Sequence, residues 1–461
     1  MTATDPCRFA RSSRLAIASQ SKLKRSRKGI TSIVLSVGLM NLRVNSHTEL
    51  FDPNTRGRCL SLGSDVRGRA NQDPLRTSWG QVAAFRLSRH HLSGRAPATA
   101  LSSVAADMAG AQAQVLLAAQ MSLWARVKGA GIQDLESAIW QERTLVRAWC
   151  MRRTMYLLPS NELAVFVRGT VRRAKREIRW VLSRGVPEQR LEKLLDDVLQ
   201  VLDRPCTQAE LAQLLSNTMG YKLKFKFGGG WGSRRKVPWV EVRDLALPAG
   251  YLLHLLGARE VVCSGPSRGN ESTFVRADRW IPRLNDIPSD QAERKLLVKY
   301  LKAFGPTTIA DFALWTGMLI SDAKEIWSRE EKDIAQVDVE GWKAAIHRPD
   351  LPELEKAEID GPIVRLLPYF DSFVLGHKSH RNIVDETNNR KIYRPQGWVS
   401  PVLLVNGRAK GVWSHVQKKD TLQVHITPFA RLSNLIRSRI KDEASDLGRF
   451  LECSNVKTVI M

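Results

Sequence analysis

The glutamines Gln112 and Gln114 are the residues whose types and spacing most clearly suggest chemistry in this chain. They stand one residue apart in the run from Met108 to Val115. Neutral amides are poor acids and poor bases, but each side chain carries both hydrogen-bond donors and an acceptor. Such a pair can orient a water molecule and hold the edge of a sugar or a base.

The stretch around this pair, from Val104 to Val127, is rich in alanine and predicts a long helix. In a regular helix, positions i and i+2 lie about 200° apart on opposite faces. Both amides can therefore serve one site only if the segment is bent, frayed or at a helix end. Gly110, just upstream, is a residue at which such a break is favourable. The spacing alone favours two ordinary helix residues, one buried and one in solvent.

A second polar segment follows about forty residues later, as Trp149-Cys150-Met151-Arg152-Arg153-Thr154-Met155-Tyr156. Together with the glutamine pair it resembles the AlkZ/YcaQ-like family of winged-helix DNA glycosylases. That family has a Gln-x-Gln or Gln-x-Asp pair and then a Trp-x-Met-Arg-Gly-Thr-x-His segment. The resemblance covers roughly residues 79 to 455. It continues through four further blocks in the family's order: Trp79–Leu92, Gly305–Gly317, Leu367–Gly376 and Gly397–Gly407.

The resemblance implies that Gln112 and Gln114 are catalytic and that the protein is a monofunctional DNA glycosylase without metal or cofactor. Two amides are weak catalysts for most glycosidic bonds, but a purine alkylated at N7 is cationic and leaves readily. The enzyme then needs only to place a water and to favour an oxocarbenium-like transition state. An open amide site, unlike a closed base-flipping pocket, would also admit bulky adducts and interstrand crosslinks, which the family is known to unhook.

The second segment departs from the family pattern at two positions. Arg153 stands where the family has Gly, and Tyr156 stands where it has His. A tyrosine can donate a hydrogen bond but cannot carry a proton near neutral pH as histidine can. We expect Arg152, Arg153, Thr154 and Tyr156 to contact DNA, while Trp149 and Met151 are expected in the core.

The charge balance favours a polyanionic partner. The formal net charge is +25, of which residues 1–78 carry +9 and the remainder +16. When Lys and Arg side chains neutralise DNA phosphates, counterions are released from the DNA. The positive charge of residues 79–461 therefore favours double-stranded DNA as the partner. Membrane surfaces and plain solubility are the weaker alternatives. The DNA-binding candidates outside the second segment are Arg172, Arg173, Arg176, Lys226, Arg234, Arg235, Lys236 and Arg381.

Each of these basic groups also has an ordinary structural interpretation. The predicted helix 163–182 carries the three arginines and could be a solvated surface helix. The Gly-rich stretch 221–236 mixes aromatic and basic residues, which is typical of a wing that enters a groove, but it could be a flexible loop. Arg381 either reaches DNA or pairs with Asp371.

The pattern of elements predicts a mainly α protein with small β wings, an α+β chain of tandem winged-helix (helix-turn-helix) units with a C-terminal β-rich region. Helices are expected at 135–148, 191–201, 292–304 and 429–451, and capping boxes begin at Thr207 and Thr308. Strands are expected at 154–158 and 335–339, and Asn406-Gly407 predicts a hairpin turn. The units are expected at 79–186, 187–288 and 289–360, followed by the β-rich region 361–461.

Residues 1–78 are rich in Arg and Ser and contain a single acidic residue, Asp5, before Glu49. Such a segment could be a mitochondrial transit peptide, a flexible DNA-binding arm or an extension without structure. We favour an extension without structure.

The six cysteines form no Cys-x-x-Cys pair, and no Cys/His cluster has zinc spacing. We therefore expect reduced thiols and a protein that lies in the cytoplasm, near the nucleoid. His377 and His380 lack a second carboxylate at fitting spacing, so no metal is expected there.

A rival function is a winged-helix DNA-binding protein without catalysis, such as a transcriptional regulator. Regulators of this kind usually dimerise and read palindromes through one recognition helix. Three unequal units in one chain fit better a monomer that wraps a damaged duplex. An RNA-binding protein is not excluded by charge, but nothing resembles a known RNA-binding module.

Overall fold

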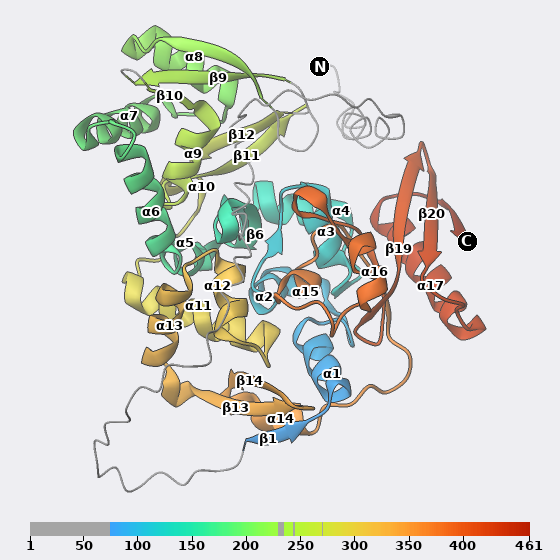
Figure 1. The fold of residues 1–461 in the computed structure, drawn as a ribbon. Coiled ribbons are helices and arrows are strands. Elements are labelled where there is room, and N and C mark those ends of the chain that lie inside the picture. Colours follow the sequence, from blue (N-terminus) through green and yellow to red (C-terminus); the bar gives the residue numbers. More distant parts are fainter. Residues whose placement is uncertain (1–73, 229–234, 243–244, 270) are drawn as a thin grey trace, which may run out of the picture.

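The computed structural model describes residues 74–228, 235–242, 245–269 and 271–461. It mixes helices and small sheets in four groups of elements along the chain (Figure 1). A five-stranded sheet in the order β15-β18-β19-β20-β21 lies in the C-terminal part, where the sequence predicts a β-rich region.

The first group carries the glutamine pair. Its elements are α1 (Trp79–Arg89), β2 (Ala96–Pro97), α2 (Leu101–Asp107), β3 (Ala111–Gln112), α3 (Leu116–Trp124), β4 (Val127–Lys128), α4 (Ile132–Glu136), β5 (Leu145–Trp149), β6 (Met155–Pro159), α5 (Leu163–Arg168) and α6 (Val171–Leu182). Two helix predictions are corrected here. The helix expected over 104–127 is interrupted by β3, and the one expected over 135–148 ends in a π-helical turn and then becomes β5.

The second group lies at the top of Figure 1, joined to the rest by α6. It contains α7 (Glu188–Val201), β7 (Cys206–Thr207), α8 (Gln208–Met219), β8 (Leu223–Gly228), β9 (Arg235–Val242), β10 (Leu245–Pro248), α9 (Ala249–Gly257), β11 (Val262–Arg268), β12 (Glu271–Arg276) and α10 (Ala277–Trp280). The predicted capping box at Thr207 is present, and β8 and β9 form an antiparallel hairpin. A hydrophobic core of its own holds the group together.

The third group has three helices followed by a hairpin: α11 (Ser289–Phe304), α12 (Ile309–Thr316), α13 (Ile320–Arg329), β13 (Ile334–Val339), β14 (Trp342–His347) and α14 (Leu351–Glu355). The capping box predicted at Thr308 opens α12. Strand β1 (Leu75–Thr77) joins this hairpin in parallel with β13, although it precedes the first group in sequence. Figure 1 shows β1 at the foot of the molecule beside β13.

The C-terminal group contains β15 (Val364–Leu367), α15 (Ser372–Leu375), α16 (Glu386–Ile392), β16 (Tyr393–Arg394), β17 (Trp398–Val399), β18 (Val402–Val405), β19 (Arg408–Lys418), β20 (Thr421–Pro428), α17 (Asn434–Phe450) and β21 (Asn455–Ile460). The predicted turn at Asn406-Gly407 joins β18 to β19, and both residues have positive φ, 48° and 77°. Strand β21, which the sequence pattern does not predict, adds to β20 in parallel.

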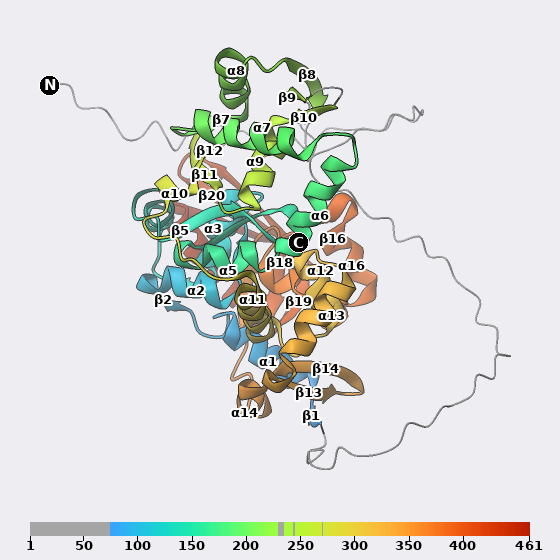
Figure 2. The same cartoon turned by 90° about the vertical axis from the view of Figure 1, so that its left-hand side faces the viewer.

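The first group is the centre of the molecule, because two separate cores meet on it. In one core, residues of the first group pack against the C-terminal sheet and α17. In the other core, residues of the first group pack against α11, α12 and α13. Figure 2 shows the same arrangement from the side, with the second group above and β1, β13 and β14 below. The glutamine pair thus sits where three groups converge.

The predicted boundary between 78 and 79 falls inside the folded body. Leu75–Thr77 pairs with Val337–Val339, and the Ser78 side chain caps α1 in a capping box with Gln81. We expect a chain that begins at Pro74 to keep the melting temperature of the full chain. A chain that begins at Trp79 should lose about 1 kcal/mol or more, since it lacks both the cap and the strand. Thermal unfolding of the two truncations checks this, and equal melting temperatures would show that β1 contributes nothing.

Candidate active site and DNA-binding surface

The chain leaves helical geometry just before the glutamine pair. Helix α2 ends at Asp107, and Ala109 and Gly110 both have positive φ, 54° and 84°. A Cβ on Gly110 would lie 2.5 Å from a methyl carbon of Leu158, so only glycine fits this turn. The break that Gly110 makes favourable is therefore present, and it turns the chain into the extended segment β3.

The extended segment changes the geometry of the pair. Gln112 is paired with Tyr156 of β6, and the ladder continues in the hydrogen bond from the Ala113 N–H to the Met155 carbonyl, 2.6 Å. Ala111 and Ala113 are fully buried in the core shared with the C-terminal group. Gln112 is the last residue of β3, and Gln114 follows two residues later in a bend. Pairing with β6 therefore replaces the regular helix in which positions 112 and 114 would lie on opposite faces.

The two glutamines differ in their surroundings. Gln112 is 7% exposed, and its Oε1 accepts a hydrogen bond from the Arg152 guanidinium at 3.0 Å. Gln114 is exposed, and among the described residues its side chain has no hydrogen-bond partner. Arg152 also donates to the Tyr156 hydroxyl at 2.5 Å. Gln112, Arg152 and Tyr156 thus form one connected cluster, with Gln114 beside it at the surface.

Tyr156, at the position of the family's histidine, is 1% exposed. Burial raises the pKa of its phenol, although the nearby Arg152 charge opposes that shift. The hydroxyl therefore stays protonated at neutral pH. It serves this cluster as a hydrogen-bonding group and not as a proton carrier.

The turn between β5 and β6 contains two consecutive arginines in left-handed geometry, Arg152 with φ 54° and Arg153 with φ 60°. The family has glycine at the position of Arg153, and glycine adopts the left-handed conformation at the lowest energetic cost. Thr154 Oγ1 closes the turn by donating to the Met151 carbonyl at 3.1 Å. Arg153 Nε reaches the buried Glu177 on α6 at 2.6 Å. Arg153, which stands where the family has glycine, therefore forms an ion pair with Glu177.

Glu177 is fully buried and accepts hydrogen bonds from both Arg153 and His254, the latter at 2.7 Å. Burial alone would raise the pKa of this carboxyl. The His254 hydrogen bond and the nearby Arg173 and Arg153 outweigh that effect and hold the pKa at about 2. The charged carboxylate ties the turn after β5 to α6 and α9.

Arg147 is a functional candidate that the sequence analysis missed. It lies on β5, is 8% exposed, and donates from Nε to the Ala113 carbonyl at 3.0 Å. Its second amino group lies 3.5 Å from the Gln114 carbonyl. Burial lowers the pKa of its guanidinium to about 10. A single arginine inside the apolar run Leu145–Trp149 was the sequence signal, and the structure shows it holding the backbone of the pair.

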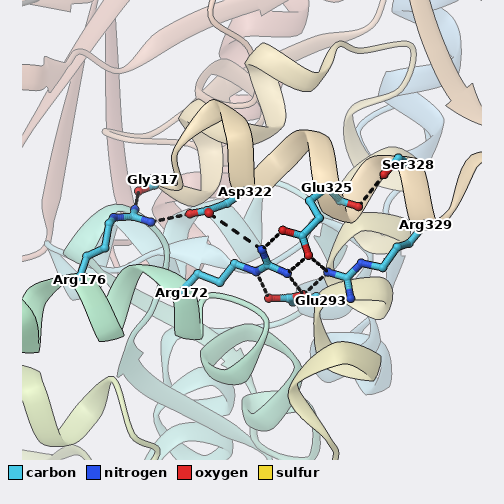
Figure 3. Close-up of polar contacts among 8 residues, drawn as sticks. All are labelled: Arg172, Arg176, Glu293, Gly317, Asp322, Glu325, Ser328 and Arg329. Carbon is cyan, nitrogen blue, oxygen red and sulfur yellow. Dashed lines mark hydrogen bonds and ion pairs between the residues drawn. The ribbon is translucent and has the colours of Figure 1, made fainter.

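Two of the three predicted DNA-binding arginines of α6, Arg172 and Arg176, are engaged with carboxylates of the third group (Figure 3). Arg172 bonds Glu293 on α11 through Nε at 2.7 Å and Glu325 on α13 at 2.5 Å. Arg329 also bonds Glu293, at 2.6 Å. A DNA phosphate would have to compete with these partners, and the predicted phosphate contact stays a prediction.

The other two predicted arginines of α6 differ in their partners. Arg176 bonds Asp322 on α13 at 2.5 Å and reaches the Gly317 carbonyl at 3.3 Å (Figure 3). Arg173 is 4% exposed and lies 3.7 Å from Glu177 of the same helix. The contacts of Arg172 and Arg176 fasten α6 to the third group, at the point where the chain leaves for the second group.

The β8–β9 hairpin presents basic and aromatic side chains to solvent. Lys226 is exposed, with its ammonium 4.3 Å from the centre of the Trp239 ring, and Lys236 is exposed as well. Phe225 and Phe227 are 57% and 71% exposed, which is unusual for phenylalanine. Arg235 belongs to β9, and Arg234 lies outside the described residues.

The pairing considered between Arg381 and Asp371 is wrong. Asp371 is fully buried and binds Arg126, also fully buried, through two oxygens at 2.8 Å each. Arg381 is exposed, so its predicted DNA contact stays a prediction.

His377 is buried against the Phe304 carbonyl, and His380 stacks on Tyr393. Within the described residues, no group of three or more His, Cys, Asp or Glu side chains could hold a metal ion.

In the described part of the chain, Cys150, Cys206 and Cys263 are buried free thiols, as predicted, and Cys453 is buried as well. Cys7 and Cys59 lie outside that part. No helix among the described residues has both the length and the apolar character needed to span a membrane.

Comparison with known proteins agrees with this fold and these motifs. The family model for AlkZ-like DNA glycosylases matches residues 105–450. An interstrand DNA cross-link repair glycosylase of Streptomyces sahachiroi is 28% identical over 385 residues, which is 81% of this chain and 97% of that protein. The solved structure of Streptomyces sahachiroi DNA glycosylase AlkZ superposes with a TM-score of 0.69 at 25% identity, covering 84% of this chain and 100% of its own. The motifs, the fold and the family model agree: this chain belongs to the AlkZ-like family of DNA glycosylases, and a regulator without catalysis is not favoured.

Proposed function

We propose that this glycosylase excises N7-alkylated purines from duplex DNA by directing a water molecule with Gln112 and Gln114. The observation that carries the proposal is the break of the helix at β3, after which Arg152 holds the oxygen of Gln112 at 3.0 Å while Gln114, two residues later, is exposed. The bond between C1′ and N9 breaks, the neutral alkylated base leaves with the bonding electron pair, and the water oxygen bonds to C1′ and releases a proton. No general acid is required because the base already carries the positive charge.

The elements around the site suit a tandem winged-helix scaffold on DNA. In the third group, three helices are followed by an antiparallel hairpin, and in the second group a capped helix is followed by the β8–β9 hairpin. The exposed Lys226, Lys236 and Arg381 are suited to phosphate contacts, which supply most of the affinity for duplex DNA. We propose that the enzyme acts as a monomer in the cytoplasm, near the nucleoid, with no metal. Residues 1–78 as a mitochondrial signal remain an alternative.

The proposed range of substrates includes interstrand crosslinks. Gln114 is exposed in the bend that follows β3, so the proposed site has an open side toward solvent. A bulky adduct that cannot be flipped into a closed pocket can approach such a site from the groove. The Streptomyces sahachiroi relative is a cross-link repair glycosylase, which supports the same range here.

The test compares a duplex carrying N7-methylguanine with one carrying an N7-linked interstrand crosslink, each with and without chelator. We expect abasic sites, seen as strand breaks after alkali, from the first duplex and unhooked strands from the second. The chelator should change neither rate, because amides and water need no metal. Inhibition by chelator would overturn the metal-free mechanism. Excision of the methylated base without unhooking would restrict the enzyme to small lesions.

A further inference from the structure

In the described structure, no carboxylate lies within 4.0 Å of Arg152, and the same is true of Arg147, which holds the backbone of the glutamine pair. The other arginines of this region, Arg153, Arg172 and Arg176, each have a carboxylate partner. The donors of Arg152 go instead to the Gln112 amide at 3.0 Å, the Tyr156 hydroxyl at 2.5 Å and the Leu375 carbonyl at 3.4 Å. Half-buried cations usually take a carboxylate, so this arrangement calls for a reason.

The chemistry of the guanidinium fixes the orientation of the amide. A guanidinium has five N–H donors and no acceptor, so the Gln112 atom that faces it must be Oε1. The Nε2 group, with its two donors, is then turned away from Arg152. A free glutamine could present either end to a ligand, but Gln112 presents a donor.

The backbone holds Arg152 in the position that this contact requires. The residue has φ 54° and ψ 23°, a left-handed conformation that L-residues rarely adopt. The C-terminal glycine of α12, Gly317, packs directly against it, since a Cβ at Gly317 would lie 3.2 Å from the Arg152 Cα. Tyr156, paired with Gln112 across the sheet, supplies a second acceptor for the same amino group. The turn after β5, the glycine that follows α12, and β6 therefore together hold the Arg152 side chain in place.

We propose that Arg152 is a positioning residue that locks the Gln112 amide with its oxygen inward, so that Gln112 acts on the substrate only as a hydrogen-bond donor. The proposal rests on the proposed catalytic role of Gln112. It differs from a phosphate contact by Arg152, because the guanidinium acts through Gln112 and not on the DNA backbone. Tyr156 supports it by holding the guanidinium from the other side.

A double-mutant cycle tests the proposal, with N7-methylguanine excision followed in single turnover above the spontaneous depurination of the same duplex. We expect Arg152→Met to lower the rate about 10- to 100-fold, the range of a hydrogen bond from a charged donor. In the Gln112→Ala background the same change should alter the residual rate less than about twofold, since the amide it positions is gone. Arg152→Lys, which keeps one donor, should recover part of the lost rate. Thermal melting of each variant shows that the fold is kept, and Arg152→Lys carries the test if Arg152→Met does not fold.

Arg153→Met is the matched control, since it removes the neighbouring arginine of the same turn, which faces Glu177 and not Gln112. Its effect should be the same fold-change in both backgrounds. Equal effects of Arg152→Met in both backgrounds would overturn the proposal. So would a weaker duplex affinity with a salt slope lowered by about one unit and an unchanged rate, which marks a phosphate contact. A fully active Gln112→Ala variant would instead refute the catalytic role on which the proposal rests.

Discussion

Replacing Gln112 or Gln114 by alanine is expected to lower the rate of N7-methylguanine excision by about 100-fold or more. Losing one preorganised polar group aimed at a transition state typically costs 10² to 10³ in rate. The affinity for the damaged duplex should change little, because the amides act on the transition state and not on the bulk of the interface. The loss should therefore appear in the single-turnover rate at saturating enzyme.

Gln133 offers a matched control, since it is an exposed glutamine on α4, outside the segment 112–114 that holds the pair. Gln133→Ala should excise at the rate of the unmodified enzyme. Excision at that same rate by both Gln112→Ala and Gln114→Ala would remove the pair from the mechanism. A loss of duplex affinity equal to the loss of rate would assign the glutamines to binding.

The position of the pair could be predicted from the sequence, but its geometry could not. The run from Val104 to Val127 has the composition of a helix, and its alanines favour one locally. What overrides that preference is pairing with β6, whose residues lie more than forty positions later. A strand of two residues has no periodicity to detect. Gly110 is the one local sign of the break, and its positive φ is the reason.

The incorrect prediction of a helix through residue 148 has a different physical cause. Strand β5 is covered on both sides, so Leu145, Val146 and Ala148 are all buried. A strand buried on both faces shows a continuous apolar run, which periodicity cannot distinguish from a buried helix. The starts of α8 and α12 are predicted correctly because the capping box of each helix is a local signal.

The charges of α6 show a third limit. The sequence favours phosphate contact by this helix because the helix itself holds few acidic residues. The carboxylates that bind Arg172 and Arg176 come from Glu293, Asp322 and Glu325, more than a hundred residues away. Local charge counts cannot reveal partners that only the tertiary fold supplies. The same holds for Asp371, whose partner Arg126 lies 245 residues earlier.

Asp371→Asn is expected to destabilise the protein by about 3 to 5 kcal/mol, because it leaves the Arg126 charge buried without a counterion. Both side chains are 0% exposed. Asp371 also accepts hydrogen bonds from the Ser122 hydroxyl at 2.7 Å and the Phe373 N–H at 3.0 Å, so its carboxylate joins α3 to α15. The shift of the urea unfolding midpoint, followed by tryptophan fluorescence, measures the loss.

Asp385→Asn provides the control for this prediction. Asp385 also pairs with an arginine, Arg408, but the two side chains are 66% and 37% exposed. Exposed pairs contribute about 0 to 1 kcal/mol, so this variant should unfold close to the midpoint of the unmodified protein. Equal shifts in the two variants would show that burial of the Arg126–Asp371 pair has no special weight.

The loss at Asp371 should also reach the active site. The next residue, Ser372, donates to the Gly110 carbonyl at 2.6 Å, directly before the strand that carries Gln112. At the other end of α15, the Leu375 carbonyl accepts from Arg152. Residues 371–375 thus brace both the turn before Gln112 and the arginine that faces it. We expect folded Asp371→Asn protein to excise more slowly at an unchanged duplex affinity, and an unaltered rate would show that this brace is not needed.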